Sequence, residues 1–206
     1  SLNIVNQWAL EYYSAQLWET DLGKSIGLGY FKERGFLETT LRKFDIGFAQ
    51  DEYQAFTTES IKKGYSVDLL KKLGLTSSTG NDFFRNRIIF PIHNQGGKVI
   101  GFAGRVLDKE AKVAKYINSP ETEVYKKSKT LYGLHLAKTA IRKLGSCILV
   151  EGYTDVMSLV QSGIENVVAS SGTSLTEDQV QLIKRHCENV IILYDGDDAG
   201  IKAAMR

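Results

Sequence analysis

The sequence predicts an α/β protein with an amino-terminal mixed α+β subdomain and a carboxyl-terminal, Rossmann-like subdomain built on a parallel sheet. Two short apolar runs, residues 148–150 and 190–194, are rich in β-branched residues and too short for helices, which is typical of strands buried on both faces of such a sheet. Further upstream the pattern changes to strand, turn, strand, as in an antiparallel hairpin. This change of architecture predicts two subdomains, residues 1–143 and 144–206.

The carboxyl-terminal part alternates strand and helix patterns. A helix is predicted over residues 155–163 and a strand over residues 166–170. A second helix is expected to begin at Ser174 as N-cap, with Glu177 completing a capping box. The resulting order β-α-β-α-β-α favours right-handed crossovers and therefore a parallel sheet.

Carboxylates follow both apolar runs. Glu151 comes directly after the first run and Asp155 four residues later, whereas Asp195 and Asp197 follow the second run. In open α/β sheets the ligand crevice lies beyond the carboxyl ends of the strands, so both clusters are expected on one rim. A lone acid after a strand is usually a cap or turn residue, but two clusters on one rim favour a divalent ion, which removes the repulsion between carboxylates. We predict Mg²⁺ at these four carboxylates, with Mn²⁺ as a substitute, because both accept oxygen ligands.

The amino-terminal part begins with an amphipathic helix, because apolar residues recur at helical spacing from Leu2 to Leu17. The elements expected after it are a helix end over residues 31–36, a strand over 44–49, helices over 57–63 and 67–73, and hairpin strands over 88–92 and 99–102. The tight connection of the hairpin is placed at residues 94–97.

Charge is distributed unevenly, although the formal net charge is only +2. Lysines and arginines crowd residues 105–143, and acids dominate after them. A basic segment together with an acidic pocket suits a polyanion that is held by the first and processed with metal ions in the second. A solvated lysine-rich face explains each single lysine about equally well. Tyr116, Tyr125 and Tyr132 interleave with the cations as on single-strand binding surfaces, and core packing explains them at least as well.

Several ordered motifs carry a family resemblance. They are Arg85-Asn86-Arg87, the sequence IGFAGR over residues 100–105, KYINSPET over residues 115–122 and LYGL over residues 131–134. These motifs resemble the catalytic core of bacterial DnaG-type primases. Glu151-Gly152 and Asp195-Gly196-Asp197 resemble the Toprim domain, which primases share with topoisomerases and some nucleases.

The resemblance implies synthesis of short RNA primers on single-stranded DNA from ribonucleoside triphosphates, by metal-dependent nucleotidyl transfer during DNA replication. Asp195 and Asp197 would be the main metal ligands, Glu151 and Asp155 would assist, and Glu151 is alternatively a general base. Asp198 is not expected to be a primary ligand. The residues expected to contact template, RNA or nucleotide are Arg34, Arg85, Arg87, Arg105, Lys115, Tyr116, Asn118, Lys127 and Lys129.

Two other functions compete with the primase hypothesis. One is a topoisomerase or nuclease of the Toprim superfamily, and a topoisomerase would need a nucleophilic tyrosine from another domain. The other is a DNA-holding module whose Toprim site has lost its chemistry. Ribonucleotide-dependent synthesis on a single-stranded template would separate the primase from the first alternative, and absence of metal binding would favour the second.

The sequence lacks the features of secreted, membrane-spanning and zinc-binding proteins. No signal peptide opens it and no apolar run is long enough to cross a bilayer, so a cytoplasmic protein without membrane contact is expected. The resemblance to primases implies association with the nucleoid. Cys147 and Cys187 lack metal-ligand spacing, so we expect reduced core or near-core residues and no zinc site in this chain.

The chain is expected to be a fragment of a longer protein, because it begins without Met and stops at Arg206 inside a predicted helix. The resemblance implies a zinc-binding module before it, further acids and a region that binds the replicative helicase after it, and a monomeric core. The isolated fragment is expected to be weakly active at most.

Overall fold

The computed structural model describes residues 2–107, 112–172 and 174–196. Contacts divide the chain into two compact units. The first unit comprises Ser1–Ile92 and Lys98–Tyr125, and the second comprises His93–Gly97 and Lys126–Arg206. The predicted boundary between the two subdomains, between residues 143 and 144, stays a prediction.

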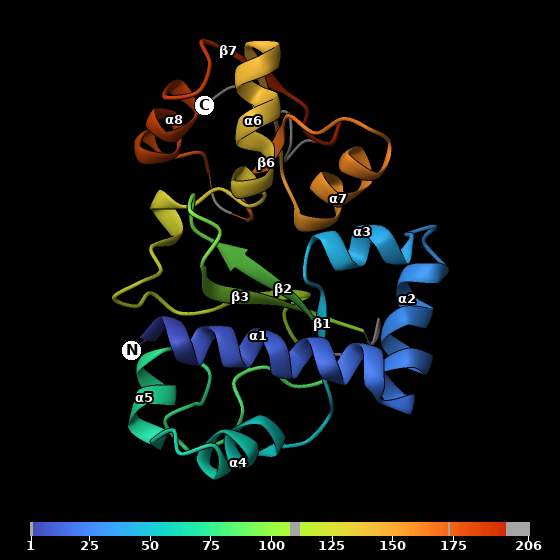
Figure 1. Cartoon of the computed structure of the whole chain (residues 1–206), viewed down its shortest axis with the longest axis vertical. Helices are drawn as coiled ribbons and strands as arrows, with labels where there is room; N and C mark the ends of the chain where they lie inside the picture. Colours follow the sequence, from blue (N-terminus) through green and yellow to red (C-terminus); the bar gives the residue numbers. More distant parts are fainter. Residues whose placement is uncertain (1, 108–111, 173, 197–206) are drawn as a thin grey trace. The chain divides into compact units, whose positions relative to one another are not determined.

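The first unit places helices around a four-stranded sheet with strand order β1-β2-β3-β4 (Figure 1). Its elements are α1 (Leu2–Glu19), the π-helix η1 (Gly23–Leu28), α2 (Gly29–Lys32), α3 (Glu38–Lys43), β1 (Gly47–Ala49), α4 (Ala55–Lys62), α5 (Val67–Lys72), β2 (Arg87–His93, of which His93 belongs to the second unit), β3 (Val99–Val106) and β4 (Tyr116–Asn118). Strand β1 pairs antiparallel with β2, and β3 pairs antiparallel with β4. The predictions of α1, of α4 and α5, and of the hairpin strands β2 and β3 are confirmed. Strand β4 was not predicted.

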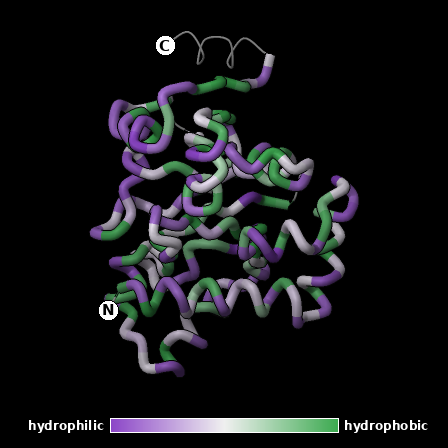
Figure 2. Tube along the Cα trace, turned by 45° about the horizontal axis from the view of Figure 1, so that its top comes forward, coloured by the Kyte–Doolittle hydropathy of each residue, from purple (hydrophilic) through white to green (hydrophobic). Residues whose placement is uncertain are grey.

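Helix α1 builds the core of this unit. Val5, Ala9, Tyr13 and Leu17 recur at every fourth position and are at most 1% exposed, and Figure 2 shows hydrophobic and hydrophilic residues alternating along the helix. A spacing of four residues returns to the same helix face, so this stripe faces the interior. Gly47 of β1 lets the helix approach closely, because a Cβ there would lie 2.6 Å from Cβ of Tyr13.

The second unit is built on a parallel sheet with strand order β6-β5-β7. Its elements are the 3-10 helix η2 (Lys127–Lys129), α6 (Leu134–Leu144), β5 (Ser146–Val150), α7 (Tyr153–Gln161), β6 (Val167–Ala169), α8 (Glu177–Lys184) and β7 (Asn189–Ile192). Strand β5 comes first in this unit and lies in the centre of the sheet, because the chain adds β6 on one side of it and then β7 on the other side. The predicted parallel sheet and its alternation with helices are therefore confirmed. Helix α6 was not predicted.

The two cysteines lie in the core of the second unit and are free, as predicted. Cys147 is fully buried at the start of β5, and Cys187 is 8% exposed. Burial raises the pKa of the Cys147 thiol to about 12, and the neighbouring Cys187 adds to this effect. Both thiols are therefore protonated at neutral pH, which makes them poor nucleophiles and poor metal ligands.

Two details of the second unit correct the sequence predictions. Helix α8 is capped by Thr176 rather than Ser174: the Thr176 hydroxyl accepts a hydrogen bond from Gln179 N at 3.2 Å, and Gln179 Oε1 accepts one from Thr176 N at 3.1 Å. The capping box is thus Thr176 with Gln179, two residues later than predicted. Strand β7 is exposed instead of buried on both faces, with Ile191 53% exposed, although the other edge strand of the sheet, β6, is buried.

None of the described helices combines the length and the apolar character that spanning a bilayer requires.

Candidate metal centre and nucleic-acid interface

Two of the predicted carboxylates leave the parallel sheet at the same edge. Strands β5 and β7 are parallel neighbours, and a bond from Leu193 N to Leu149 O, 2.9 Å long, extends their pairing by one residue. Glu151 follows β5 directly, Asp195 lies two residues after Leu193, and Glu151 Oε1 accepts a hydrogen bond from Asp195 N at 2.9 Å. The predicted rim is therefore confirmed for these two residues.

Asp155 lies in the first turn of α7, at its third position. Its Oδ2 accepts a hydrogen bond from the N–H of the N-cap residue Gly152 at 2.9 Å. A carboxylate there satisfies one unpaired donor of the helix terminus and is favoured by the helix dipole, an arrangement that contributes about 1 kcal/mol. Asp155 therefore has a structural task beside the predicted one, and this task fixes the direction of its side chain.

A cavity of about 250 Å³ lies between these acids. Its walls combine carboxylates with apolar side chains and one phenol, from the residues Val150, Glu151, Asp155, Ser158, Leu159, Leu193, Tyr194 and Asp195. Burial raises the pKa of Tyr194, a hydrogen bond with Ser170 opposes that rise, and the charge of Glu151 adds to it. Tyr194 thus stays a neutral hydroxyl beside the carboxylates at neutral pH.

The cavity gathers three of the four predicted metal ligands, Glu151, Asp155 and Asp195. Asp197 and Asp198 lie outside the described residues. Within the described ranges, no three His, Cys, Asp or Glu side chains are close enough together to hold an ion. Carboxylate oxygens are the donors that hard divalent cations prefer, so the donor chemistry fits, and the complete ligand set stays a prediction.

The predicted lysines Lys127 and Lys129 lie on η2, which the start of α8 holds in place. Thr176 Oγ1 donates to Ser128 O at 2.6 Å, and Nε2 of the fully buried Gln179 donates to Thr130 O at 2.9 Å and to Lys127 O at 3.3 Å. The Lys129 side chain is 64% exposed, with its Nζ 3.8 Å from a carboxylate oxygen of α8. The backbone of this lysine pair is therefore fixed, while the Lys129 ammonium group reaches solvent.

In the first unit, two predicted arginines share one aromatic ring. The guanidinium carbon of Arg34 lies 3.7 Å from the ring centroid of Tyr30, and that of Arg105 lies 4.6 Å from it. Arg105 also lies 5.8 Å from the ring of Tyr116, the predicted aromatic contact on β4. Burial raises the pKa of Tyr30, and both guanidinium groups oppose that rise. Tyr30 was not predicted as a site residue, and its only signal in the sequence is its spacing of four residues from Arg34.

The other two predicted arginines differ in their surroundings. Arg85 forms an ion pair with Asp51 at 3.0 Å and packs on the ring of Tyr53 at 3.9 Å. Arg87 is only 7% exposed, and burial lowers its pKa. A contact of Arg87 with nucleic acid stays a prediction, and its surroundings show a further role.

That role is to hold the segment before β4. Arg87 Nη1 donates to Gly104 O and Ala114 O, both at 3.1 Å, and lies 3.4 Å from Lys115 O. The Lys115 side chain is exposed, and Tyr116 and Asn118 are half-buried on the edge strand. The guanidinium of Arg87 therefore fixes the backbone that carries three predicted contacts.

Comparison with known proteins places this geometry in a family. Residues 12–138 match the family described as "DNA primase catalytic core, N-terminal domain". The chain belongs to the DNA primase catalytic core family. Residues 148–206 of this primase core match a second family, described as "Toprim-like", which covers the acidic rim.

Relatives agree with this assignment. The DNA primase of Listeria monocytogenes is 43% identical over 206 residues, which are 98% of this chain and 33% of the relative. The RNA polymerase domain of Mycobacterium tuberculosis primase DnaG superposes with a TM-score of 0.91 at 34% identity, over 99% of this chain and 69% of that one. A DnaG primase catalytic domain solved with single-stranded DNA superposes with a TM-score of 0.88 at 37% identity, over 99% and 64%.

This primase core spans about a third of the length of the curated relatives it matches. Its amino-terminal half matches a domain named for primases, so a topoisomerase or nuclease is not favoured. Primases of the Toprim superfamily depend on metal ions.

Proposed function

We propose that the chain is the catalytic core of a DNA primase and synthesises short RNA primers on single-stranded DNA by metal-dependent nucleotidyl transfer during DNA replication. The observation that carries this proposal is the shared rim: parallel pairing of β5 and β7 delivers Glu151 and Asp195 to one edge, in a chain whose other half matches the primase core. Its substrates are ribonucleoside triphosphates and its product is an RNA primer.

The proposed metal ligands are Asp195 and Asp197, assisted by Glu151 and Asp155, and the proposed ion is Mg²⁺ with Mn²⁺ as a substitute. When bound, the ion would neutralise charge on the reacting phosphate and activate the 3′-hydroxyl of the primer. The residues of the chain prepare this step: backbone N–H groups hold one oxygen each of Glu151 and Asp155, so these carboxylates are oriented before substrate arrives. Glu151 remains the alternative general base. Zinc is not part of the proposal.

The nucleic acid is proposed to contact both units. In the first unit, Arg34 and Arg105 on the ring of Tyr30, with Tyr116 beside Arg105, combine positive charge and aromatic faces as single-strand binding surfaces do. The other proposed contacts to template, RNA or nucleotide are Arg85, Lys115, Asn118, Lys127 and Lys129, and Arg87 is proposed to act by positioning Lys115. Support comes from the DnaG relative solved with single-stranded DNA.

The proposal includes the wider setting of the protein. A monomeric core acts on chromosomal DNA in the cytoplasm, associated with the nucleoid, and the replicative helicase is contacted through a region outside this chain. Bacterial primases among the relatives support this setting.

Primer synthesis by a chimera tests the proposal. The matching segment of the Listeria monocytogenes primase is replaced by this chain, and incorporation of labelled ribonucleotides on single-stranded DNA is measured with Mg²⁺ and with Mn²⁺. The chimera should prime, and Glu151→Gln should lower its rate by at least about 10-fold to 100-fold, the loss that follows when a residue supporting the ligands of a metal site is changed.

Glu188→Gln is the matched control, because Glu188 is exposed just before the amino end of β7, at the opposite end of the same strand from Asp195. It should leave the rate unchanged. A chimera that makes no primer, or equal rates for the two variants, would contradict the proposed function.

A further inference from the structure

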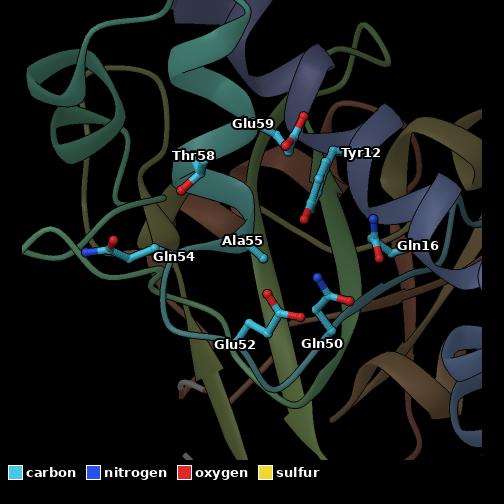
Figure 3. Close-up of a pocket in the computed structure, with 8 residues that line it drawn as sticks. All are labelled: Tyr12, Gln16, Gln50, Glu52, Gln54, Ala55, Thr58 and Glu59. Atoms are coloured by element: carbon cyan, nitrogen blue, oxygen red, sulfur yellow. The ribbon is translucent and has the colours of Figure 1, made fainter.

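A second cavity, of about 460 Å³, lies in the first unit beside the carboxyl half of α1 (Figure 3). It contains none of the predicted metal or nucleic-acid residues. Its walls come from α1, the segment after β1 and the first turns of α4, and they consist of Tyr12, Gln16, Gln50, Glu52, Gln54, Ala55, Thr58 and Glu59.

Tyr12 presents an unsatisfied hydroxyl to this cavity. The residue is only 8% exposed, and its ring packs against Tyr13 and Phe56 with centroid distances of 5.5 and 5.2 Å. Figure 3 shows its oxygen pointing into the cavity, and this oxygen makes no hydrogen bond with any other described residue. The ring of Tyr12 is therefore buried while its hydroxyl opens into the cavity, where a ligand can form a hydrogen bond with it.

Three further polar groups face the same space. In Figure 3 the amides of Gln16 and Gln50 and the carboxylate of Glu52 turn toward the Tyr12 hydroxyl. Within the part of the chain that the structure describes, none of these three side chains makes a hydrogen bond or an ion pair. By contrast, Glu59 is paired with Lys62 at 2.6 Å. The cavity thus holds an unpaired set of one carboxylate, two amides and one phenol.

The charge of the cavity selects a cation. Burial raises the pKa of Tyr12, and the carboxylates of Asp82, Glu59 and Glu52 raise it further, so the surroundings are negative although the chain as a whole carries a net charge of +2. A phosphate would be repelled there. A bare divalent ion is not favoured either, since Glu59 is paired with Lys62 and Glu52 is left as the one lining carboxylate without an ion pair among the described residues.

A guanidinium fits the remaining requirements. It is planar, always charged and less strongly hydrated than an ammonium group, and it pairs with a carboxylate through two parallel hydrogen bonds. Its five N–H donors match the oxygen atoms of Glu52, Gln16, Gln50 and Tyr12, and its flat face packs on apolar surface such as Ala55.

We propose that this cavity binds an arginine side chain presented by a peptide segment of a partner protein, with Glu52 as the bidentate acceptor. Tyr12, Gln16 and Gln50 accept the outer N–H groups, and Ala55 contacts the aliphatic stem. The volume of about 460 Å³ accommodates the whole side chain and the peptide backbone next to it. This partner site is independent of primer synthesis, because it shares no residue with the proposed metal and nucleic-acid contacts.

The test uses N-acetyl-arginine methylamide as the probe, titrated into the ¹⁵N-labelled chain and followed by NMR. Amide shifts should concentrate on residues 12–16 and 50–59. The citrulline analogue has the same shape without the charge and should bind at least about tenfold more weakly, and the lysine analogue about fivefold more weakly.

Variants assign the binding to Glu52. Glu52→Gln should raise the Kd of the arginine probe by about tenfold, and Tyr12→Phe, which keeps the ring, by about threefold. The control is Glu11→Gln on α1, an exposed carboxylate that accepts a bond from Gln7 at 3.1 Å, and it should leave the Kd unchanged. Equal Kd values for arginine and either analogue, equal Kd values for the Glu52 and Glu11 variants, or shifts that concentrate on other residues would overturn the proposal.

Discussion

Substitution of Arg87 by methionine should destabilise the first unit and weaken DNA binding without removing a phosphate contact. Methionine keeps the apolar stem and loses the guanidinium, whose Nη1 donates to Gly104 O and Ala114 O at 3.1 Å. Two hydrogen bonds from a charged donor contribute about 3–6 kcal/mol before desolvation is counted. The residue is 7% exposed and its pKa is lowered by burial, so part of that gain is offset. We expect a net loss of about 2–4 kcal/mol in the free energy of unfolding.

The two tryptophans of the chain, Trp8 and Trp18, both lie in α1. Urea unfolding followed by tryptophan fluorescence therefore reports on the first unit alone. With a slope of about 2 kcal/mol per M, the midpoint should fall by about 1–2 M. Affinity for single-stranded DNA, measured without urea, should fall as well, because the released segment carries Lys115.

Salt dependence separates positioning from direct contact. A direct phosphate contact contributes about 0.7 to the slope of log affinity against log salt for a single strand. Lys115→Ala should lower this slope by that amount. Arg87→Met should lower the affinity and keep the slope, because the released segment must be ordered at an entropic cost but Lys115 still makes its contact once DNA is bound. An unchanged urea midpoint together with a reduced slope in Arg87→Met would refute the positioning role and establish Arg87 as a phosphate contact.

Three further outcomes are expected. Asp195→Asn should weaken Mn²⁺ binding in a calorimetric titration while the fold persists, because removing a charge from crowded carboxylates relieves repulsion, and affinity equal to that of Glu188→Gln would contradict the metal assignment. Lys127→Ala should reduce affinity for single-stranded DNA and lower the salt slope by about 0.7, and parental values of both would place this lysine on a solvated face. Burial raises the pKa of Asp82 above 3.8, so the folded chain binds that proton more tightly than the unfolded chain and stability falls as pH rises from about 4 through the raised pKa. Urea midpoints measured across this pH interval should decline in the parent and decline less in Asp82→Asn. Identical pH profiles of the two proteins would contradict the contribution of Asp82 to this decline.

The sequence was informative where one local pattern decides the structure. Apolar runs of β-branched residues located β5 and β7, and a spacing of four residues located α1, because both periods are properties of single elements. The shared rim followed from topology: parallel neighbours present their carboxyl ends together, which placed Glu151 and Asp195 correctly. The family resemblance, confirmed by the matches over most of the chain, rested on several short motifs in order.

What the sequence did not reveal depends on contacts between distant residues. The two edge strands of the parallel sheet differ, since β6 is buried and β7 is exposed, and an apolar run alone does not report which elements cover a strand. The burial of Arg87 arises from carbonyl groups 17 to 28 residues away. The ring of Tyr30 between two arginines was invisible for the same reason, since Arg105 reaches it from a distant strand of the chain. Strand β4 has three residues, too few for a period to show.

Because of the buried amide of Gln179, the position of Lys127 and Lys129 depends on how helix α8 is rotated about its own axis. Gln179 Nε2 holds Lys127 O and Thr130 O, while its Oε1 closes the capping box of the same helix. Inserting one residue before position 179 would rotate this side chain by about 100° and detach it from the loop, although every lysine and every acid would still be present. The chain should therefore tolerate changes of side chain on η2 far better than changes of length at the start of α8.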